Sequence, residues 1–157
     1  MKVGKLNALK LAACIILSEV AGIIGSVFTM PNIPAWYVSL VKPSFNPPNW
    51  LFAPVWTALF ALMGISLYLI WTKSKGRRPF YAFTVQLLLN VAWSILFFGL
   101  KSPSAGFVCI VALWLSIAAC IIMFWKISRT ASMLFVPYIA WVSFASLLNY
   151  MIWVLNP

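Results

Sequence analysis

Residues 104–125 read SAGFVCIVALWLSIAACIIMFW, a run without a single charged side chain. A helix that crosses a bilayer needs about 20 mainly apolar residues, so this run predicts a membrane-spanning helix. Four more apolar runs, each bounded by charged residues or proline, lie at about 8–30, 49–72, 79–100 and 133–155. Their apolar residues are continuous rather than alternating, which excludes a transmembrane β-barrel. The sequence therefore predicts an all-α integral membrane protein, a bundle of five transmembrane helices that forms one domain over residues 1–157.

The composition indicates a membrane protein and excludes most classes of enzyme. Residues of the set AVILMFWYC make up 64% of the chain and charged residues only 8%, with Glu19 as the one acidic residue and no histidine. A soluble domain is about a quarter charged. Catalysis by paired carboxylates or by histidine needs side chains that are missing here. The three cysteines, Cys14, Cys109 and Cys120, lack metal-ligand spacing. We therefore expect no metal site and no cofactor.

The basic residues predict the orientation in the membrane. The amino-terminal segment and the connections at 73–78 and 126–132 share one side and carry nine Lys and Arg, whereas the other side carries only Lys42 and Lys101. Cytoplasmic loops are enriched in Lys and Arg, so we expect the amino terminus inside and the carboxyl terminus outside a prokaryotic cell membrane. The basic residues form no single patch, so the net charge of +10 does not indicate nucleic-acid binding.

The first two runs raise separate questions at their boundaries. The first is interpreted as a helix rather than a secretory signal, because it contains Glu19 and lacks a clear cleavage site. The proline-rich segment 31–48 that follows is the longest connection, and we expect it to be a lid on the outer side. Pro34 is expected to open a short helix in which Trp36, Tyr37 and Leu40 share an apolar face. Simple anchoring at the membrane interface is the alternative.

Polar residues at helical spacing point to a shared interior, because uncharged polar groups in hydrocarbon usually face other helices or a cavity. Three runs carry such stripes: Glu19, Gly22, Ser26 and Thr29 in the first, Gln86, Asn90, Trp93 and Phe97 in the third, and Tyr138, Trp141, Ala145 and Asn149 in the fifth. For Glu19 and Gln86 we favour hydrogen bonds between helices. For Asn90, Trp93, Trp141 and Asn149 we favour a ligand cavity.

The nine tryptophans divide by depth. Those near the ends of the predicted spans are expected at the membrane interface: Trp50, Trp71, Trp125 and Trp153. Trp114 is deep but has no polar stripe beside it, so a packing role is expected. Flat indole faces beside amides suit a planar apolar ligand. We place its site in the outer half of the bundle, formed by Ser26, Trp56, Phe60, Asn90, Trp93, Phe97, Trp141 and Asn149.

Two prolines fall inside predicted spans. Pro54 and Pro137 are each expected to remove a helical hydrogen bond and to kink the helix. Kinked helices leave space between them, which supports a cavity.

Four segments resemble a known family: WYVSLVKPSFNPPNWLFAPVW (36–56), QLLLNVAWSILFFG (86–99), VPYIAWVSFASLLNYMIW (136–153) and GIIGSVFT (22–29). They are similar, in the same order, to the signature segments of the tryptophan-rich sensory protein / translocator protein family, once called peripheral benzodiazepine receptors. The resemblance covers nearly the whole chain. It implies five membrane helices, a homodimer, and binding of porphyrins such as protoporphyrin IX and of isoquinoline or benzodiazepine ligands.

The resemblance also implies site residues. By motif position the pocket residues are Trp36 in the lid, Trp56, Asn90, Trp93, Trp141 and Ala145. Some bacterial members are reported to degrade protoporphyrin in light, and tryptophans matching Trp56 and Trp141 are implicated, so these two would be catalytic if the protein is an enzyme. The sterol motif of animal members needs a basic residue soon after Tyr150, and MIWVLNP has none.

Three functions stay open at this point. A receptor or sensor for porphyrins and other planar apolar ligands is favoured. A light-dependent porphyrin-degrading enzyme and a transporter of tetrapyrroles or other apolar molecules are the alternatives. Ordinary proton-coupled transport is disfavoured because Glu19 is the only carboxylate within a span.

The dimer contact is expected on the 79–100 helix. Phe83, Leu87 and Val91 form a bulky apolar side there, whereas the small stripe of Ala112, Ser116 and Cys120 on 104–125 can pack within the protomer.

Overall fold

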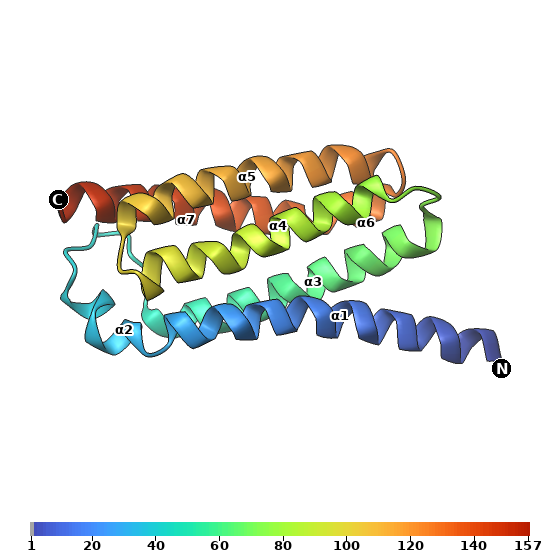
Figure 1. Ribbon diagram of the computed structural model, residues 1–157, viewed down its shortest axis with the longest axis horizontal. Coiled ribbons are helices and arrows are strands. Elements are labelled where there is room, and N and C mark those ends of the chain that lie inside the picture. Colours follow the sequence, from blue (N-terminus) through green and yellow to red (C-terminus); the bar gives the residue numbers. More distant parts are fainter. Residues whose placement is uncertain (1) are drawn as a thin grey trace.

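The computed structural model describes the backbone of residues 2–157 and the side chains of residues 7–157. Its long helices are α1 (Lys2–Thr29), α3 (Phe52–Lys73), α4 (Arg78–Ser94), α5 (Pro103–Trp125) and α7 (Val136–Leu155). Shorter elements are α2 (Asn32–Ala35), η1 (Tyr37–Ser39), η2 (Asn49–Leu51), the π-helical turn η3 (Ile95–Gly99) and α6 (Arg129–Met133). The long helices run side by side along the molecule, with the amino terminus at one end and the carboxyl terminus at the other (Figure 1).

Five segments are long and apolar enough to cross a membrane: Asn7–Ala35, Asn49–Lys73, Arg78–Gly99, Pro103–Trp125 and Arg129–Leu155. Each contains one of the predicted spans to within a few residues. The all-α, five-helix prediction is therefore confirmed.

Helix α1 packs on α3 and α4, while α5 packs between α4 and α7. The contact between α1 and α3 depends on two glycines. A Cβ added at Gly64 would lie 2.5 Å from the Cα of Ile15, and one added at Gly22 would lie 2.5 Å from the Phe60 ring. Small residues allow membrane helices to approach this closely, where dispersion contacts are the main source of attraction.

The half of the bundle near α6 is filled by aromatic side chains. Phe135 contacts Phe124, Tyr138 and Phe83, with ring centroids 5.3, 5.9 and 6.2 Å away, and all four rings are buried. The Ser66 hydroxyl donates to the Ala131 carbonyl at 2.8 Å, which ties α3 to α6. These contacts pack α3, α4, α5 and α7 around the α6 end of the bundle.

The prediction that Pro54 kinks a helix in mid-span is wrong. Pro54 lies in the first turn of α3 and Pro137 in the first turn of α7. The first N–H groups of a helix have no partner within it, so proline removes no hydrogen bond there. The last span is interrupted between α6 and α7, in the residues directly before Pro137, where its kink was expected.

The 31–48 segment packs across the carboxyl-terminal end of the bundle. Its first helix begins at Asn32 rather than at Pro34, which corrects the expected start. The Tyr37 hydroxyl donates to Asn46 Oδ1 at 2.7 Å, and burial raises the pKa of Tyr37 to about 12. The Asn156 amide pairs with both backbone groups of Val41, at 2.9 and 3.0 Å, and fastens the segment to the end of α7.

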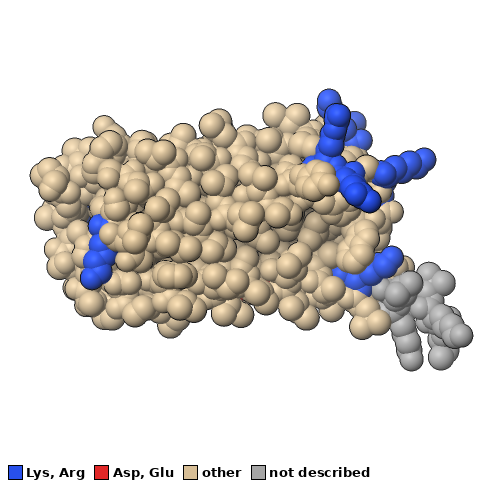
Figure 2. Space-filling view, in the orientation of Figure 1, with Lys and Arg blue, Asp and Glu red and all other residues tan. Residues whose placement is uncertain are grey.

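Lys and Arg gather at the end of the bundle opposite the 31–48 segment, with few at the segment's own end (Figure 2). This is the separation of charge on which the predicted orientation depends.

Within the bundle, two expectations about individual side chains fail. Gln86 is fully buried, yet neither of its side-chain polar atoms has a hydrogen-bond partner among the described residues, so it does not link helices. Phe83 and Leu87 are buried inside the protomer and cannot form a dimer surface.

Candidate functional site

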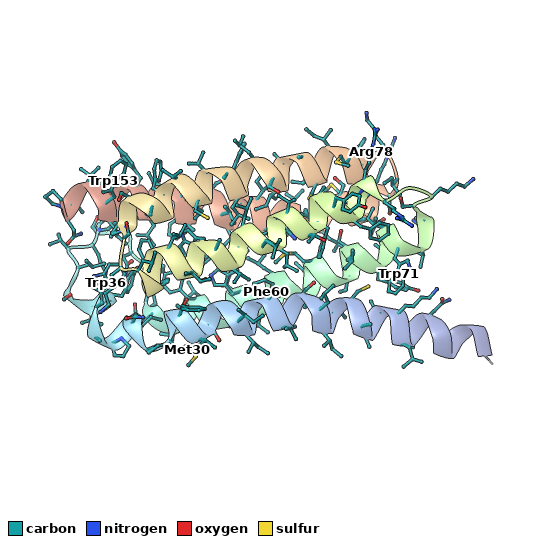
Figure 3. All side chains as sticks on the ribbon, viewed as in Figure 1. Met30, Trp36, Phe60, Trp71, Arg78 and Trp153 are labelled. Carbon is teal, nitrogen blue, oxygen red and sulfur yellow. The ribbon has the colours of Figure 1, made fainter. Side chains whose placement is uncertain are left out.

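A cavity of about 520 Å³ lies under the 31–48 segment, between α1, α3, α4 with η3, and α7. Figure 3 shows Met30 and Trp36 near the end of the bundle that carries this segment, Phe60 deeper, and Trp71 and Arg78 at the opposite end. The cavity therefore lies toward the end of the bundle that carries the 31–48 segment. Its lining is mainly apolar and aromatic, which is typical of a small-molecule site.

Eight of the ten predicted site residues line this cavity: Ser26, Trp56, Phe60, Asn90, Trp93, Phe97, Ala145 and Asn149. Helical periodicity explains their convergence, since residues three or four apart share one face of a helix. On α1 the same face brings Glu19, Gly22 and Thr29 to the cavity. Whether these residues bind a ligand stays a prediction.

Trp36 and Trp141 are not among the lining residues. The Trp36 ring packs against Phe97 and Phe98 with centroids 5.5 and 6.4 Å apart, so it lies behind the wall that these rings form. Trp141 lies behind Phe52, 6.0 Å between centroids, and its indole N–H is buried without a partner among the described residues. Phe52, which does line the cavity, separates Trp141 from it.

The aromatic wall is a continuous row of rings. Trp56 lies 5.8 Å from Phe60 and 6.2 Å from Trp93, each pair at an interplanar angle of 32°. Trp93 stacks on Phe97 at 5.6 Å and 24°. All four residues line the cavity, so the wall can offer aromatic contacts to a flat ligand.

The turn η3 shapes this wall. A π-helical turn is wider than an α-helical one, and it follows Ser94 directly. Phe97 and Phe98, adjacent in sequence, both line the cavity.

The amides beside the wall are held by other helices. The Trp93 indole N–H donates to Asn149 Oδ1 at 3.0 Å, and Asn149 Nδ2 donates to the Pro103 carbonyl at 2.7 Å. Asn90 Nδ2 donates to the Tyr138 hydroxyl at 2.9 Å. The sequence left open whether such residues form hydrogen bonds between helices or line a cavity. Here they do both, since they link α4, α5 and α7 and also face the cavity.

Sequence reasoning missed much of the outer rim. Residues just after α1, in the 31–48 segment, in η2 and at the start of α3 complete it: Met30, Ile33, Tyr37, Asn49, Trp50, Phe52, Ala53 and Thr57. Trp50 was expected only at the membrane interface; it is 71% exposed and lines the rim. The exposed lining residues belong to the end of the first span, to η2 and to the start of α3: Ile23, Met30, Asn49, Trp50, Ala53 and Thr57.

Trp114 lies elsewhere, on α5. Its indole N–H donates to the Ser143 hydroxyl of α7 at 2.8 Å. It therefore helps to pack α5 on α7, as expected, and does not face the cavity.

The comparisons with known proteins agree with this architecture. Residues 14–154 match the model of the TspO/MBR family. The chain is similar to the tryptophan-rich protein TspO of Chlorobaculum tepidum, at 48% identity over 95% of this chain and 97% of that protein. It is also similar to the tryptophan-rich protein TspO of Archaeoglobus fulgidus, at 45% identity over 96% and 99%, and to the translocator protein of Bos taurus, at 37% identity over 88% and 85%. The chain belongs to the TspO/MBR family of membrane proteins.

Proposed function

We propose that this protein is a membrane receptor that binds porphyrins, protoporphyrin IX among them, and other planar apolar ligands in the cavity under the 31–48 segment. The observation that carries the proposal is the row of slightly inclined rings formed by Trp56, Phe60, Trp93 and Phe97. Offset stacking and edge contacts stabilise such rings against a flat aromatic ligand. The volume of about 520 Å³ lies within the range of small-molecule sites.

Replacement of Trp56 by Phe tests the proposal. Trp56 touches Phe60, Trp93 and Tyr138 and lines the cavity, so the change should weaken protoporphyrin IX binding by about fivefold, on the order of 1 kcal/mol. Titration of the purified protein in nanodiscs, followed by porphyrin absorbance, measures the affinity.

Trp114→Phe is the matched control, because Trp114 lies on another face of the bundle, and it should bind the porphyrin as the unchanged protein does. Equal affinities for the unchanged protein and for Trp56→Phe would remove Trp56 from the ligand site. Trp141→Phe should weaken porphyrin binding less than Trp56→Phe does, since Phe52 stands between Trp141 and the cavity.

The alternative function, light-dependent degradation of porphyrin, also depends on the position of Trp56 in the cavity lining. An indole that faces the cavity can take part in light-dependent degradation of a bound porphyrin. The titration is therefore repeated in light and in darkness. Loss of the porphyrin spectrum with a new product supports an enzyme, while a stable bound spectrum under both conditions supports a receptor.

We further propose that the amino terminus and the 74–77 connection face the cytoplasm of a prokaryotic cell. In a background without native cysteines, a thiol introduced as Lys42→Cys should react with an impermeant reagent from outside intact cells, and one introduced as Lys75→Cys should not. The positions suit the test because they lie at opposite ends of the bundle, in the 31–48 segment and just beyond α3. The opposite pattern of labelling would reverse the orientation.

A homodimer is also proposed, on the basis of family membership. If α4 takes part in the contact, it has to use the apolar side chains that it exposes, Tyr81, Val85 and Leu88, rather than the buried Phe83 and Leu87.

A further inference from the structure

We infer that the cavity also accepts planar aromatic cations, and that the Glu19 carboxylate pairs with their positive charge. The inference shares the cavity of the proposed function, and names a class of ligand different from the anionic porphyrins.

Glu19 lies at the deep end of the cavity. It precedes Gly22 by about one turn of α1, and Gly22 faces the Phe60 ring. It precedes Thr29, near the end of α1, by ten residues, which is about 15 Å along a helix axis. The only acidic side chain of the chain is therefore within a membrane span and at the innermost part of the cavity.

Among the side chains of residues 7–157, no cation neutralises this carboxylate. None of the lining residues is Lys or Arg, and among the side chains of residues 7–157 none forms a hydrogen bond or ion pair with Glu19. Two basic residues of the long helices contact other groups: Lys10 lies over the Trp71 ring at 5.5 Å, and Lys73 Nζ donates to the Ser128 hydroxyl at 3.3 Å. A carboxyl group without a partner in a low-dielectric site takes up a proton rather than stay charged, and a bound cation that pairs with Glu19 favours its charged form instead.

Several other polar groups of the lining donate within the protein. The Trp93 indole and the Asn149 amide donate within the protein. The hydroxyls of Ser26, Thr29 and Thr57 donate to carbonyls of their own helices. Glu19 adds a carboxyl acceptor to this lining, and a ligand that carries an N–H group can donate to it.

The aromatic wall favours the same ligand. The faces of Trp56, Phe60 and Trp93 carry negative electrostatic potential, and an organic cation near such faces is attracted to them. A flat aromatic amine can place its ring along the wall and its charged nitrogen toward Glu19.

The test compares two flat three-ring probes of similar shape. 9-Aminoacridine is a cation at neutral pH, and anthracene is neutral. In the unchanged protein in nanodiscs of neutral lipid, 9-aminoacridine should bind more tightly than anthracene, as measured by quenching of probe fluorescence. Glu19→Gln should weaken 9-aminoacridine about tenfold or more, the effect of losing a hydrogen bond to a charged group, and should leave anthracene within about twofold and protoporphyrin IX bound.

A second measurement needs no variant. Dicyclohexylcarbodiimide modifies carboxyl groups in membranes, and Glu19 is the only acidic side chain that it can label. 9-Aminoacridine, but not anthracene, should protect Glu19 from labelling, as read by mass spectrometry. If protoporphyrin IX binds while 9-aminoacridine shows no preference over anthracene and no protection, the inference fails and the proposed function stands. If no probe binds the unchanged protein, the proposed function fails as well.

Discussion

Gly64→Leu should destabilise the protein more than any other single change on α3. A Cβ at this position would lie 2.5 Å from the Cα of Ile15, 2.8 Å from its backbone nitrogen and 2.9 Å from the carbonyl oxygen of Cys14. All three atoms belong to the α1 backbone, so no rotation of a side chain relieves the overlap and the two helices have to separate. Forced overpacking costs about 1–3 kcal/mol and sometimes more, and we expect the upper end here. The midpoint of unfolding in SDS or on heating measures the loss.

Two other glycines provide controls for this prediction. No heavy atom lies within 4 Å of a Cβ added at Gly76, so Gly76→Ala should leave the midpoint unchanged. At Gly22 the added Cβ meets the Phe60 side chain rather than backbone, so Gly22→Ala should cost less stability than Gly64→Ala and should disturb the cavity instead. If Gly64→Leu unfolds at the same midpoint as Gly76→Ala, α1 and α3 do not approach each other as described.

The number and limits of the membrane helices were predictable because they depend on a simple physical quantity, the length of uncharged chain that spans hydrocarbon. The run 104–125 needed no tertiary information, and α5 covers Pro103–Trp125. Prolines were harder to interpret. Proline costs a hydrogen bond only inside a helix, and the sequence alone did not show that α3 and α7 begin only two and one residues before Pro54 and Pro137.

The lining residues that lie on one face of a helix could be predicted from the sequence. Those whose position depends on the connections between helices were harder to predict. Ser26, Asn90 and Asn149 follow helical periodicity and face the cavity. Trp141 satisfies the same periodicity, yet the start of α3 inserts Phe52 in front of it. The rim residues around Trp50 belong to segments without periodicity, so their placement depends on how the 31–48 segment packs. A polar residue also need not find a partner, as Gln86 shows.

Asn149→Leu should reduce both stability and porphyrin binding. Asn149 is 1% exposed, accepts from the Trp93 indole and donates to the Pro103 carbonyl. Leucine leaves that N–H and that carbonyl without partners in a dry environment. Each buried unsatisfied group costs about 1–3 kcal/mol, whereas hydrogen bonds between membrane helices measure about 0.6 kcal/mol on average, so we expect a loss of about 2 kcal/mol. Porphyrin affinity should also fall, because Trp93 loses the bond that fixes its ring in the wall.

A double-mutant cycle with Trp93→Phe separates the shared hydrogen bond from the rest. Phenylalanine has no N–H to leave unpaired, so Asn149→Leu should cost less in the Trp93→Phe background than in the unchanged protein. The remaining cost reports the bond to Pro103, which is 2.7 Å long and independent of Trp93. If the two single changes add without coupling, in both the unfolding midpoint and the porphyrin affinity, the bond between Trp93 and Asn149 does not position the aromatic wall.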